Sequence, residues 1–373
     1  MDLYMGLMSG TSMDGIDAAL LEIDATAGMR VRAAAAREWP AALQARLRRA
    51  AERSEATGLH ELGELDSAVG VQLALAAAGL LQSAGVHAAA VRAIGSHGQT
   101  LLHRPSGEAP FTLQVGDPNI IAERLGIDVV ADFRRRDIAA GGEGAPLMPA
   151  FHAAAFGASG QRRAVVNIGG IANVTLLGTD LDVIGFDTGP GNCLLDAWAR
   201  RHLERAYDAD GRWAASGQVQ PALLARLSAD PYFARPAPKS TGRDTFSDAW
   251  LERALAAEPA GIGAVDVQAT LAELTATSIA AGLVQGGARA PAHAFVCGGG
   301  AFNADLMQRL ARALPDTHWQ STAACGIAPE HVEAAGFAWL AHRFLQGQPG
   351  NLPSVTGARH PVPLGALYRG RLA

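Results

Sequence analysis

The fold class is decided by one stretch near the middle of the chain, Val183-Ile-Gly-Phe-Asp-Thr-Gly-Pro-Gly-Asn-Cys-Leu-Leu-Asp196. A short apolar run ends on Asp187, turn-forming residues follow, and apolar positions at helical spacing begin at Leu194. The pattern predicts a β-strand that ends at Asp187, a tight turn and then a helix. In open α/β sheets ligands bind beyond the carboxyl ends of the strands. Asp187 is therefore a candidate catalytic residue, and the alternative is an aspartate that only caps its own turn.

The turn after Asp187 contains Gly189, Pro190 and Gly191. We expect these residues to let the backbone approach a ligand closely and to leave the amides that open the following helix free. Gly189 and Pro190 are accordingly candidate substrate-binding residues.

Length and composition indicate a two-domain protein of the cytoplasm. At 373 residues the chain is too long for one compact core, and 49% hydrophobic with 18% charged residues is ordinary for soluble proteins. No apolar run approaches the roughly 18 residues of a spanning helix, and the first residues lead directly into strand-like sequence. The net charge of −5 gives no reason to expect nucleic acid or an anionic membrane as a partner. Three widely spaced cysteines argue against a disulfide framework.

Two glycine-containing hairpins are predicted, about one domain length apart. The first joins the apolar runs 2–9 and 18–23 through Gly10-Thr-Ser-Met-Asp-Gly-Ile-Asp17, and the second joins 163–167 and 174–177 through Ile168-Gly-Gly-Ile-Ala-Asn173. Backbone amides and hydroxyls in the first turn suit a phosphate, although the turn is not a Walker loop and a plain hairpin is the alternative. The repetition favours a duplicated unit, with a domain boundary near the linker 141–146.

Other candidate residues follow predicted strands or open helices. His97 and Gln99 come after the strand 91–95, although a single histidine is often only structural. The segment 112–131 reads as a strand, a helix and a parallel strand, followed by Arg134. Gly298, Gly299 and Gly300 separate a strand from a helix, and Glu333 lies in the first turn of the helix 330–345, where it could simply complement the helix dipole.

The order of these turns resembles the sugar kinase, heat-shock ATPase and actin superfamily. Six motifs in order resemble the anhydro-N-acetylmuramic acid kinase family: residues 8–17, 96–100, 132–134, 167–173, 185–192 and 238–243, with Val332-Glu-Ala334 and Phe337-Ala-Trp-Leu-Ala341 extending the match almost to the end. The resemblance implies an α/β fold of two duplicated ribonuclease-H-like lobes, the actin-like ATPase fold, with an interlobe active-site cleft. We expect an N-terminal lobe, 1–142, with the first phosphate hairpin and the sugar-binding strand ends. The C-terminal lobe, 143–373, would hold the second phosphate hairpin, the catalytic aspartate and the nucleoside glycine turn.

The family phosphorylates 1,6-anhydro-N-acetylmuramic acid with ATP while water opens the anhydro ring, which yields N-acetylmuramic acid 6-phosphate and recycles cell-wall peptidoglycan in amino-sugar metabolism. The resemblance implies Asp187 and Glu333 as catalytic residues. It implies ATP contacts from Gly10, Thr11, Ser12, Met13, Asp14, Gly15, Ile16, Asp17, Gly169, Gly170, Gly298, Gly299 and Gly300. Mg²⁺ is the implied metal ion. Met8 stands where the wider superfamily often has an acidic residue, and we expect Asp14 to contact the metal through water instead.

The small-molecule substrate is assigned to three residues of the first lobe and to one lysine. We expect His97, Gln99 and Arg134 to hold the N-acetyl and lactyl groups, because a guanidinium can bind both oxygens of a carboxylate. Lys239 is the one lysine among the basic residues, and we expect it to contact bound ligand because a compact ammonium suits a phosphate. Two alternatives stay open: a kinase of another sugar or small acid, and an actin- or chaperone-like ATPase acting on protein partners. Assembly into a homodimer also stays open.

Overall fold

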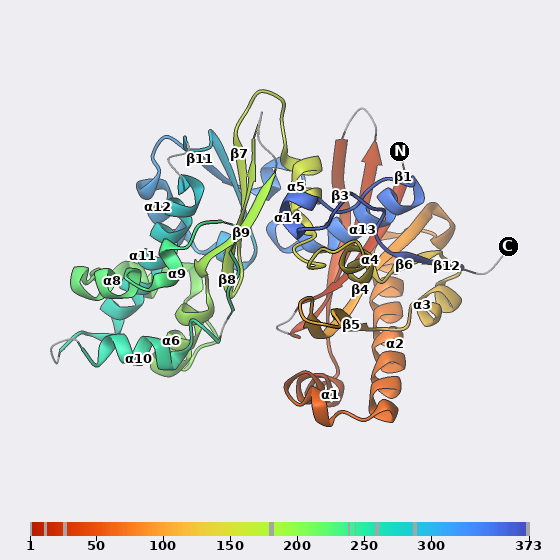
Figure 1. Ribbon diagram of the computed structural model, residues 1–373, viewed down its shortest axis with the longest axis horizontal. Coiled ribbons are helices and arrows are strands. Elements are labelled where there is room, and N and C mark those ends of the chain that lie inside the picture. The colour runs from red at the N-terminus through yellow and green to blue at the C-terminus, as the bar shows by residue number, and fades with distance from the viewer. Residues whose placement is uncertain are drawn as a thin grey trace. The chain divides into compact units, whose positions relative to one another are not determined.

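The structure, a computed structural model, describes residues 2–10, 13–24, 28–178, 183–237, 239–242, 244–257, 261–285 and 289–370. These residues form two compact units, each built on one β-sheet (Figure 1). Unit 1 comprises Met1–Ala155, Cys325–Ile327 and His331–Ala373, and unit 2 comprises Phe156–Ala324 and Ala328–Glu330.

The sheet of unit 1 has seven strands among the described residues. They are β1 (Asp2–Ser9), β2 (Gly15–Asp24), β3 (Gly28–Glu38), β4 (Val91–Arg104), β5 (Phe111–Val115), β6 (Val129–Ala131) and β12 (Ala366–Tyr368). Their order is β12-β6-β4-β1-β2-β3, with β5 paired to β4. The antiparallel pairing of β1 with β2, in a register that sets Met8 opposite Asp17, confirms the first predicted hairpin.

The sheet of unit 2 repeats the central part of this topology. Its strands are β7 (Arg163–Ile168), β8 (Ile171–Leu177), β9 (Ile184–Pro190), β10 (His293–Cys297) and β11 (His318–Ser321), in the order β11-β10-β7-β8-β9. In both sheets three strands form an antiparallel meander, and two later strands extend the sheet parallel to the first. The predicted duplication of a ribonuclease-H-like unit is confirmed.

The predicted strand-helix-strand unit over 112–131 has a different pairing. β5 pairs antiparallel with β4 over Gln99–Arg104, whereas β6 pairs parallel with β4 over Ile94–Ser96. β4 is long enough to take both partners in succession along one edge, so β5 and β6 are not paired in the described sheet.

The seven α-helices that begin in unit 1 are α1 (Ala41–Glu52), α2 (Leu59–Ala84), α3 (Pro118–Leu125), α4 (Phe133–Ala139), α5 (Met148–Phe156), α13 (Val332–Leu345) and α14 (Pro353–Thr356). Those of unit 2 are α6 (Cys193–Leu203), α7 (Arg212–Ser216), α8 (Pro221–Ser228), α9 (Pro231–Ala234), α10 (Asp248–Leu255), α11 (Ala264–Leu283) and α12 (Ala304–Ala313). These counts refer only to the described ranges given above.

The compact units differ from the predicted lobes 1–142 and 143–373. The division falls after Ala155, and the segment from His331 onward returns to unit 1. α13 packs on β1 and β4, where a Cβ on Gly6 or Gly95 would collide with the backbone of the helix. The absence of a side chain at these glycines therefore lets α13 lie directly on the sheet, and β12 adds a strand beside β6.

One described helix, α2, is long and apolar enough by length and composition to cross a membrane. The expectation that no such stretch exists is therefore wrong. Core helices pass the same test, and one face of α2 packs in the core of unit 1 through Leu65, Val69, Leu73 and Leu80 at helical spacing.

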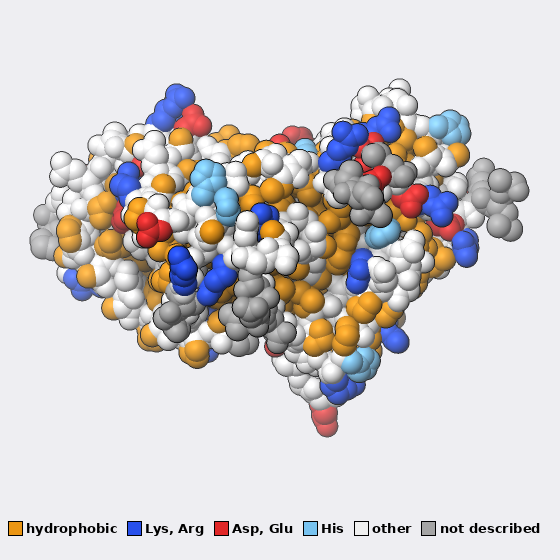
Figure 2. Space-filling model, turned by 90° about the horizontal axis from the view of Figure 1, so that it is seen from above, with side chains coloured by type: hydrophobic (Ala, Val, Ile, Leu, Met, Phe, Trp, Pro, Cys, Tyr) orange, Lys and Arg blue, Asp and Glu red, His pale blue; other side chains and the backbone are white. Residues whose placement is uncertain are grey.

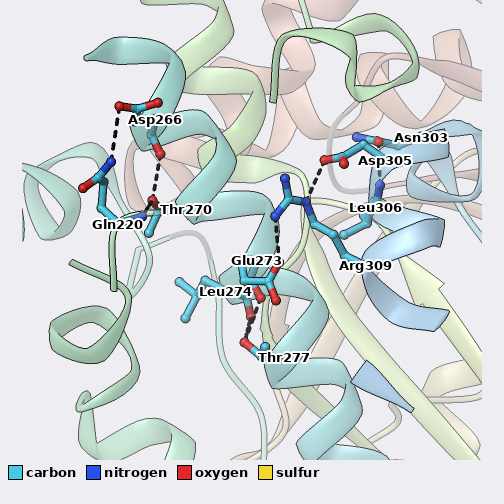
Figure 3. A network of polar contacts seen from close by, with 10 residues as sticks. All are labelled: Gln220, Asp266, Thr270, Glu273, Leu274, Thr277, Asn303, Asp305, Leu306 and Arg309. Carbon is cyan, nitrogen blue, oxygen red and sulfur yellow. Dashed lines mark hydrogen bonds and ion pairs between the residues drawn. The ribbon is translucent and has the colours of Figure 1, made fainter. Parts of the chain in front are cut away.

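A buried ion network joins α11 to α12 within unit 2 (Figure 3). Arg309 donates from Nε to Asp305 Oδ2 and from Nη1 to Glu273 Oε2, both at 2.7 Å. The side chains of Arg309 and Asp305 are only 6% and 9% exposed, so each charge depends on its partner. Asn303 caps α12 by accepting a hydrogen bond from Leu306 N at 2.9 Å.

The face drawn in Figure 2 carries basic side chains singly or in small groups, interspersed with acidic, polar and hydrophobic ones.

Candidate active site

Asp187 lies in the middle of β9, whereas the sequence predicted that it would end the strand. β9 continues to Pro190 and carries a bulge, because Asp187 faces Asn173 while Gly189 faces the adjacent Ala172. Thr188 is the extra residue of that bulge. Such bulges bend a strand and re-aim its side chains. The turn residues of the deciding stretch therefore extend the strand before α6 begins.

The half-buried carboxylate of Asp187 is held by a loop that lies far from it in the sequence. Asp187 Oδ2 accepts hydrogen bonds from Thr241 N at 2.9 Å and from Ser240 Oγ at 3.1 Å. The backbone of Asp187 is also held, since its N–H donates to Lys239 O and its carbonyl accepts from Tyr232 Oη at 2.7 Å. Burial raises the pKa of Asp187 above its usual range, and the two hydrogen bonds to the carboxylate oppose that rise.

Lys239 contacts protein groups beside Asp187. Its Nζ donates to the carbonyls of Tyr232 and Phe233, at 3.3 and 3.2 Å, and lies 4.8 Å from the centre of the Tyr232 ring. Burial, with help from the charge of Arg235, lowers the pKa of Lys239. These contacts tie the loop 239–242 to α9, so they indicate a role in positioning the partners of Asp187.

The second hairpin turn packs on the start of α6. Gly169 O accepts from Asn192 N at 2.8 Å, and Gly170 O accepts from Gly191 N and Cys193 N at 2.9 and 3.0 Å. The amides of Gly191, Asn192 and Cys193 are therefore used by the hairpin, which does not favour the expectation that the amides at the start of α6 are free for a ligand. Gly189 and Pro190 are buried at the end of β9, which does not favour their predicted contact with substrate.

In unit 1, the structure brings His97 and Arg134 together. Arg134 Nε donates to His97 Nε2 at 2.9 Å, and Arg134 Nη1 donates to Gly144 O at 2.8 Å. His97 lies inside β4, not at a strand end, with its ring 4.7 Å from that of Phe337. Burial and the charge of Arg134 hold the pKa of His97 well below its usual range, so the ring is neutral. Burial lowers the pKa of Arg134 to about 10, which leaves it charged at neutral pH.

Glu333 opens α13 in the same unit, as predicted. Its side chain is exposed to solvent. Desolvation by the surrounding protein raises the pKa of Glu333. The charge of Arg134 lowers this pKa, and the charge of Asp17 raises it. Glu333 thus belongs electrostatically with Arg134 rather than only with the dipole of its own helix.

Gln99 contacts the first hairpin through its side chain. It is fully buried inside β4, where its Oε1 lies 2.7 Å from Ser9 Oγ and its Nε2 lies 3.3 Å from Gly10 O. These contacts do not favour its predicted contact with sugar. Thr11 and Ser12 lie outside the described residues.

The three glycines after β10 have different surroundings. A Cβ at Gly298 would meet Asn167 Oδ1 and Ile168 O, at 2.5 and 2.8 Å, and a Cβ at Gly300 would collide with the Ile168 side chain. Gly299 has only Asn192 Nδ2 nearby, 3.6 Å from the position of a Cβ. Packing on β7 thus explains two of the glycines, and Gly299 is the one best placed for a predicted nucleotide contact.

No group of three or more His, Cys, Asp or Glu side chains that could hold a metal ion occurs among the described residues. Asp14, the predicted metal contact, is 75% exposed and lies 3.6 Å from Arg48 Nη2. An exposed carboxylate is compatible with contact to a metal through water, because Mg²⁺ usually keeps several waters and binds substrate phosphates.

Ser240, Thr241 and Tyr232 were not predicted as site residues. They stand more than forty positions from Asp187, where no spacing rule applies, and the signal for Ser240 and Thr241 was their place in the motif 238–243.

The two ribonuclease-H-like sheets define the class of actin-like ATPases, which includes sugar kinases. A model of the family described as anhydro-N-acetylmuramic acid kinase matches residues 2–370, and the chain belongs to that family. The enzyme of this name from Xylella fastidiosa is 50% identical over 368 residues, 98% of this chain and 96% of the relative. The enzyme from Xanthomonas campestris is 51% identical over 370 residues, 98% and 97% of the two chains. Among solved structures, the activator of the 2-hydroxyisocaproyl-CoA dehydratase from Clostridium difficile is similar with a TM-score of 0.46 and 12% identity, covering 90% of this chain and 92% of that one.

Proposed function

We propose that the chain is an ATP-dependent kinase that converts 1,6-anhydro-N-acetylmuramic acid and water to N-acetylmuramic acid 6-phosphate. Membership of the family over residues 2–370 supports this reaction. The observation that carries it within the site is the half-buried Asp187 carboxylate, fixed by Thr241 N and Ser240 Oγ. We place the enzyme in the cytoplasm, where it would recycle cell-wall sugar.

Asp187 serves as the general base in this proposal. Water attacks the anomeric carbon, the bond from that carbon to oxygen 6 breaks, and the proton of the water passes to the carboxylate. Oxygen 6 then accepts the γ-phosphoryl group and ADP leaves. Burial supports this role, because a base works best with a pKa nearer the working pH than that of a free aspartate.

Glu333 and Arg134 serve the sugar side of the reaction. Glu333 stabilises positive charge that develops at the anomeric carbon, as a carboxylate can. Arg134 already donates from Nε and Nη1 to His97 and Gly144, so its orientation is fixed before substrate arrives. Its remaining donors would hold the lactyl carboxylate.

The nucleotide binds through its phosphates to the turn after β1 and the turn after β7. Mg²⁺, when bound with ATP, neutralises phosphate charge, and Asp14 would contact it through water. Gly299 would approach the nucleoside.

Mass spectrometry tests substrate and reaction together. The purified protein is incubated with the anhydro-sugar, ATP and water enriched in the heavy oxygen isotope. We expect one added phosphoryl group and one heavy oxygen at the anomeric carbon of the product. A phosphorylated product that retains the anhydro ring would contradict the proposed ring opening, and turnover of a different sugar alone would contradict the substrate.

A further inference from the structure

We infer that Gln44 is a positioning residue for the nucleotide-binding turn of unit 1, which it acts on from α1. The inference rests on the proposed function, because it assigns the turn to the phosphates of ATP. Gln44 Nε2 donates to the carbonyl of Met13 at 2.8 Å.

The contact fixes the direction of one peptide group. In a trans peptide the C=O of one residue and the N–H of the next point in opposite directions. Because the Met13 carbonyl is turned toward Gln44, the N–H of Asp14 is turned away from it, and Asp14 is exposed to solvent. A carbonyl in that position would repel an anion, whereas an N–H attracts one.

The conformation of Met13 needs such support. Its φ of 55° lies in the left-handed region, which residues other than glycine rarely adopt without strong surrounding contacts. The Met13 side chain is buried in the core of unit 1, and its N–H donates to Gly10 O at 3.1 Å. Gln44 adds the contact on the carbonyl side of the residue.

Two other carbonyls, at the ends of the turn, also lie within hydrogen-bond distance of polar side chains. Ser9 Oγ lies 2.7 Å from Gly15 O, and Gln99 Nε2 lies 3.3 Å from Gly10 O. With Gln44 on Met13 O, three polar side chains occupy the carbonyls of Gly10, Met13 and Gly15. We call this set, Ser9, Gln44 and Gln99, the carbonyl clamp.

The position of Gln44 on α1 suits this role. Leu43 and Leu47, on the adjoining side of the helix, are buried in the core of unit 1. Arg48, one turn after Gln44 on the same face, lies 3.6 Å from Asp14. Gln44 and Arg48, on two successive turns of α1, therefore lie next to Met13 and Asp14.

The second hairpin has its carbonyls occupied by different groups. Gly169 O and Gly170 O accept from the amides at the start of α6. In both units the turn thus has carbonyls bonded to the protein, which favours outward-facing amides and an anionic ligand.

The test compares nucleotide binding with adenosine binding. Gln44→Met keeps the length of the side chain but removes the donor, and it adds no charge. We expect calorimetry to show roughly three- to tenfold weaker binding of a non-hydrolysable ATP analogue, in line with one lost hydrogen bond. Adenosine, which has no phosphates, should bind as it does to the wild-type protein. The KM for ATP should rise while the KM for the sugar stays unchanged.

Gln82→Met is the matched control, since Gln82 is exposed on α2 and should leave both affinities unchanged. Wild-type affinity for the ATP analogue in Gln44→Met would overturn the inference, as would equal weakening of analogue and adenosine. Should Gln44→Met unfold, Gln44→Lys, which retains a donor, must fold and bind the analogue at least as tightly as wild type. A wild-type protein that binds no nucleotide would instead refute the proposed function.

Discussion

Replacing Asp187 by asparagine should lower the catalytic rate without lowering the stability of the protein. The amide has nearly the same shape, and its oxygen can still accept from Thr241 N and Ser240 Oγ. It cannot take a proton from water. Loss of a general base typically costs ~10²–10⁴ in rate, which corresponds to roughly 2.7–5.5 kcal/mol of transition-state stabilisation. We expect kcat to fall by that factor, while the dissociation constants for ATP and sugar change less than a few-fold.

The stability of Asp187→Asn should be equal to or higher than that of wild type at neutral pH. Burial raises the folded-state pKa of Asp187, so ionisation of this group costs folding free energy above that pKa. Asparagine removes the cost. Turnover would be followed by coupled detection of ADP, and stability by urea unfolding. A variant that turns over near the wild-type rate would refute the assignment of Asp187 as the base, and one that unfolds at lower urea than wild type would refute the expected effect on stability.

The pH dependence gives a second measurement on the same group. The acid limb of kcat/KM should lie above the ordinary aspartate pKa of 3.8, since the base is inactive once protonated. Ser240 donates to the charged form and thereby lowers the pKa of Asp187. Ser240→Ala should therefore move the acid limb to higher pH. A limb that stays in place would show that Asp187 does not control it.

Three further variants test other parts of the structure. Glu333→Gln should lower kcat tenfold or more with little change in melting temperature, whereas a helix-dipole role alone would cost ~0.3–1 kcal/mol of stability and no activity. Lys239→Met should slow turnover and lower the free energy of unfolding by ~1–3 kcal/mol, because two carbonyls of α9 lose their donor; a rate equal to wild type would contradict its positioning role. Arg309→Met should cost ~3–5 kcal/mol in urea unfolding, since it leaves Asp305 and Glu273 unpaired; a cost below 1 kcal/mol would show that the network is not needed for stability.

Hairpins and long helices could be predicted from the sequence because their signals are local. Both hairpins appear with their expected strands, and Glu333 lies in the first turn of α13 as expected. The pairing of β5 could not be predicted, because it depends on the length of β4 and on which neighbour occupies its edge. The return of α13 to unit 1 depends on Gly6 and Gly95, whose role is visible only once the helix lies on the sheet.

The sequence predicted residues of the candidate site better than it predicted the contacts that these residues make. His97 and Arg134 lie in one unit as expected, whereas Glu333, which the predicted lobe 143–373 would have contained, lies in that same unit. Gln99 is a buried support, because its amide reaches the turn after β1 from within β4. β9 continues to Pro190, so Asp187 lies inside the strand rather than at its expected end, and no composition rule predicts the bulge at this point.

The basicity of Asp187 depends on where the loop 239–242 is held. Burial raises the pKa of the carboxylate, and the donors of Ser240 and Thr241 lower it. Both donors belong to a loop whose anchor is Lys239, bonded to the carbonyls of α9. A change that loosens this anchor would remove the donors and leave burial to raise the pKa further, so the carboxylate would be protonated over more of the acid range. The lysine therefore affects proton transfer without touching a reacting atom, through the two hydrogen bonds that oppose the rise in the pKa of the buried Asp187.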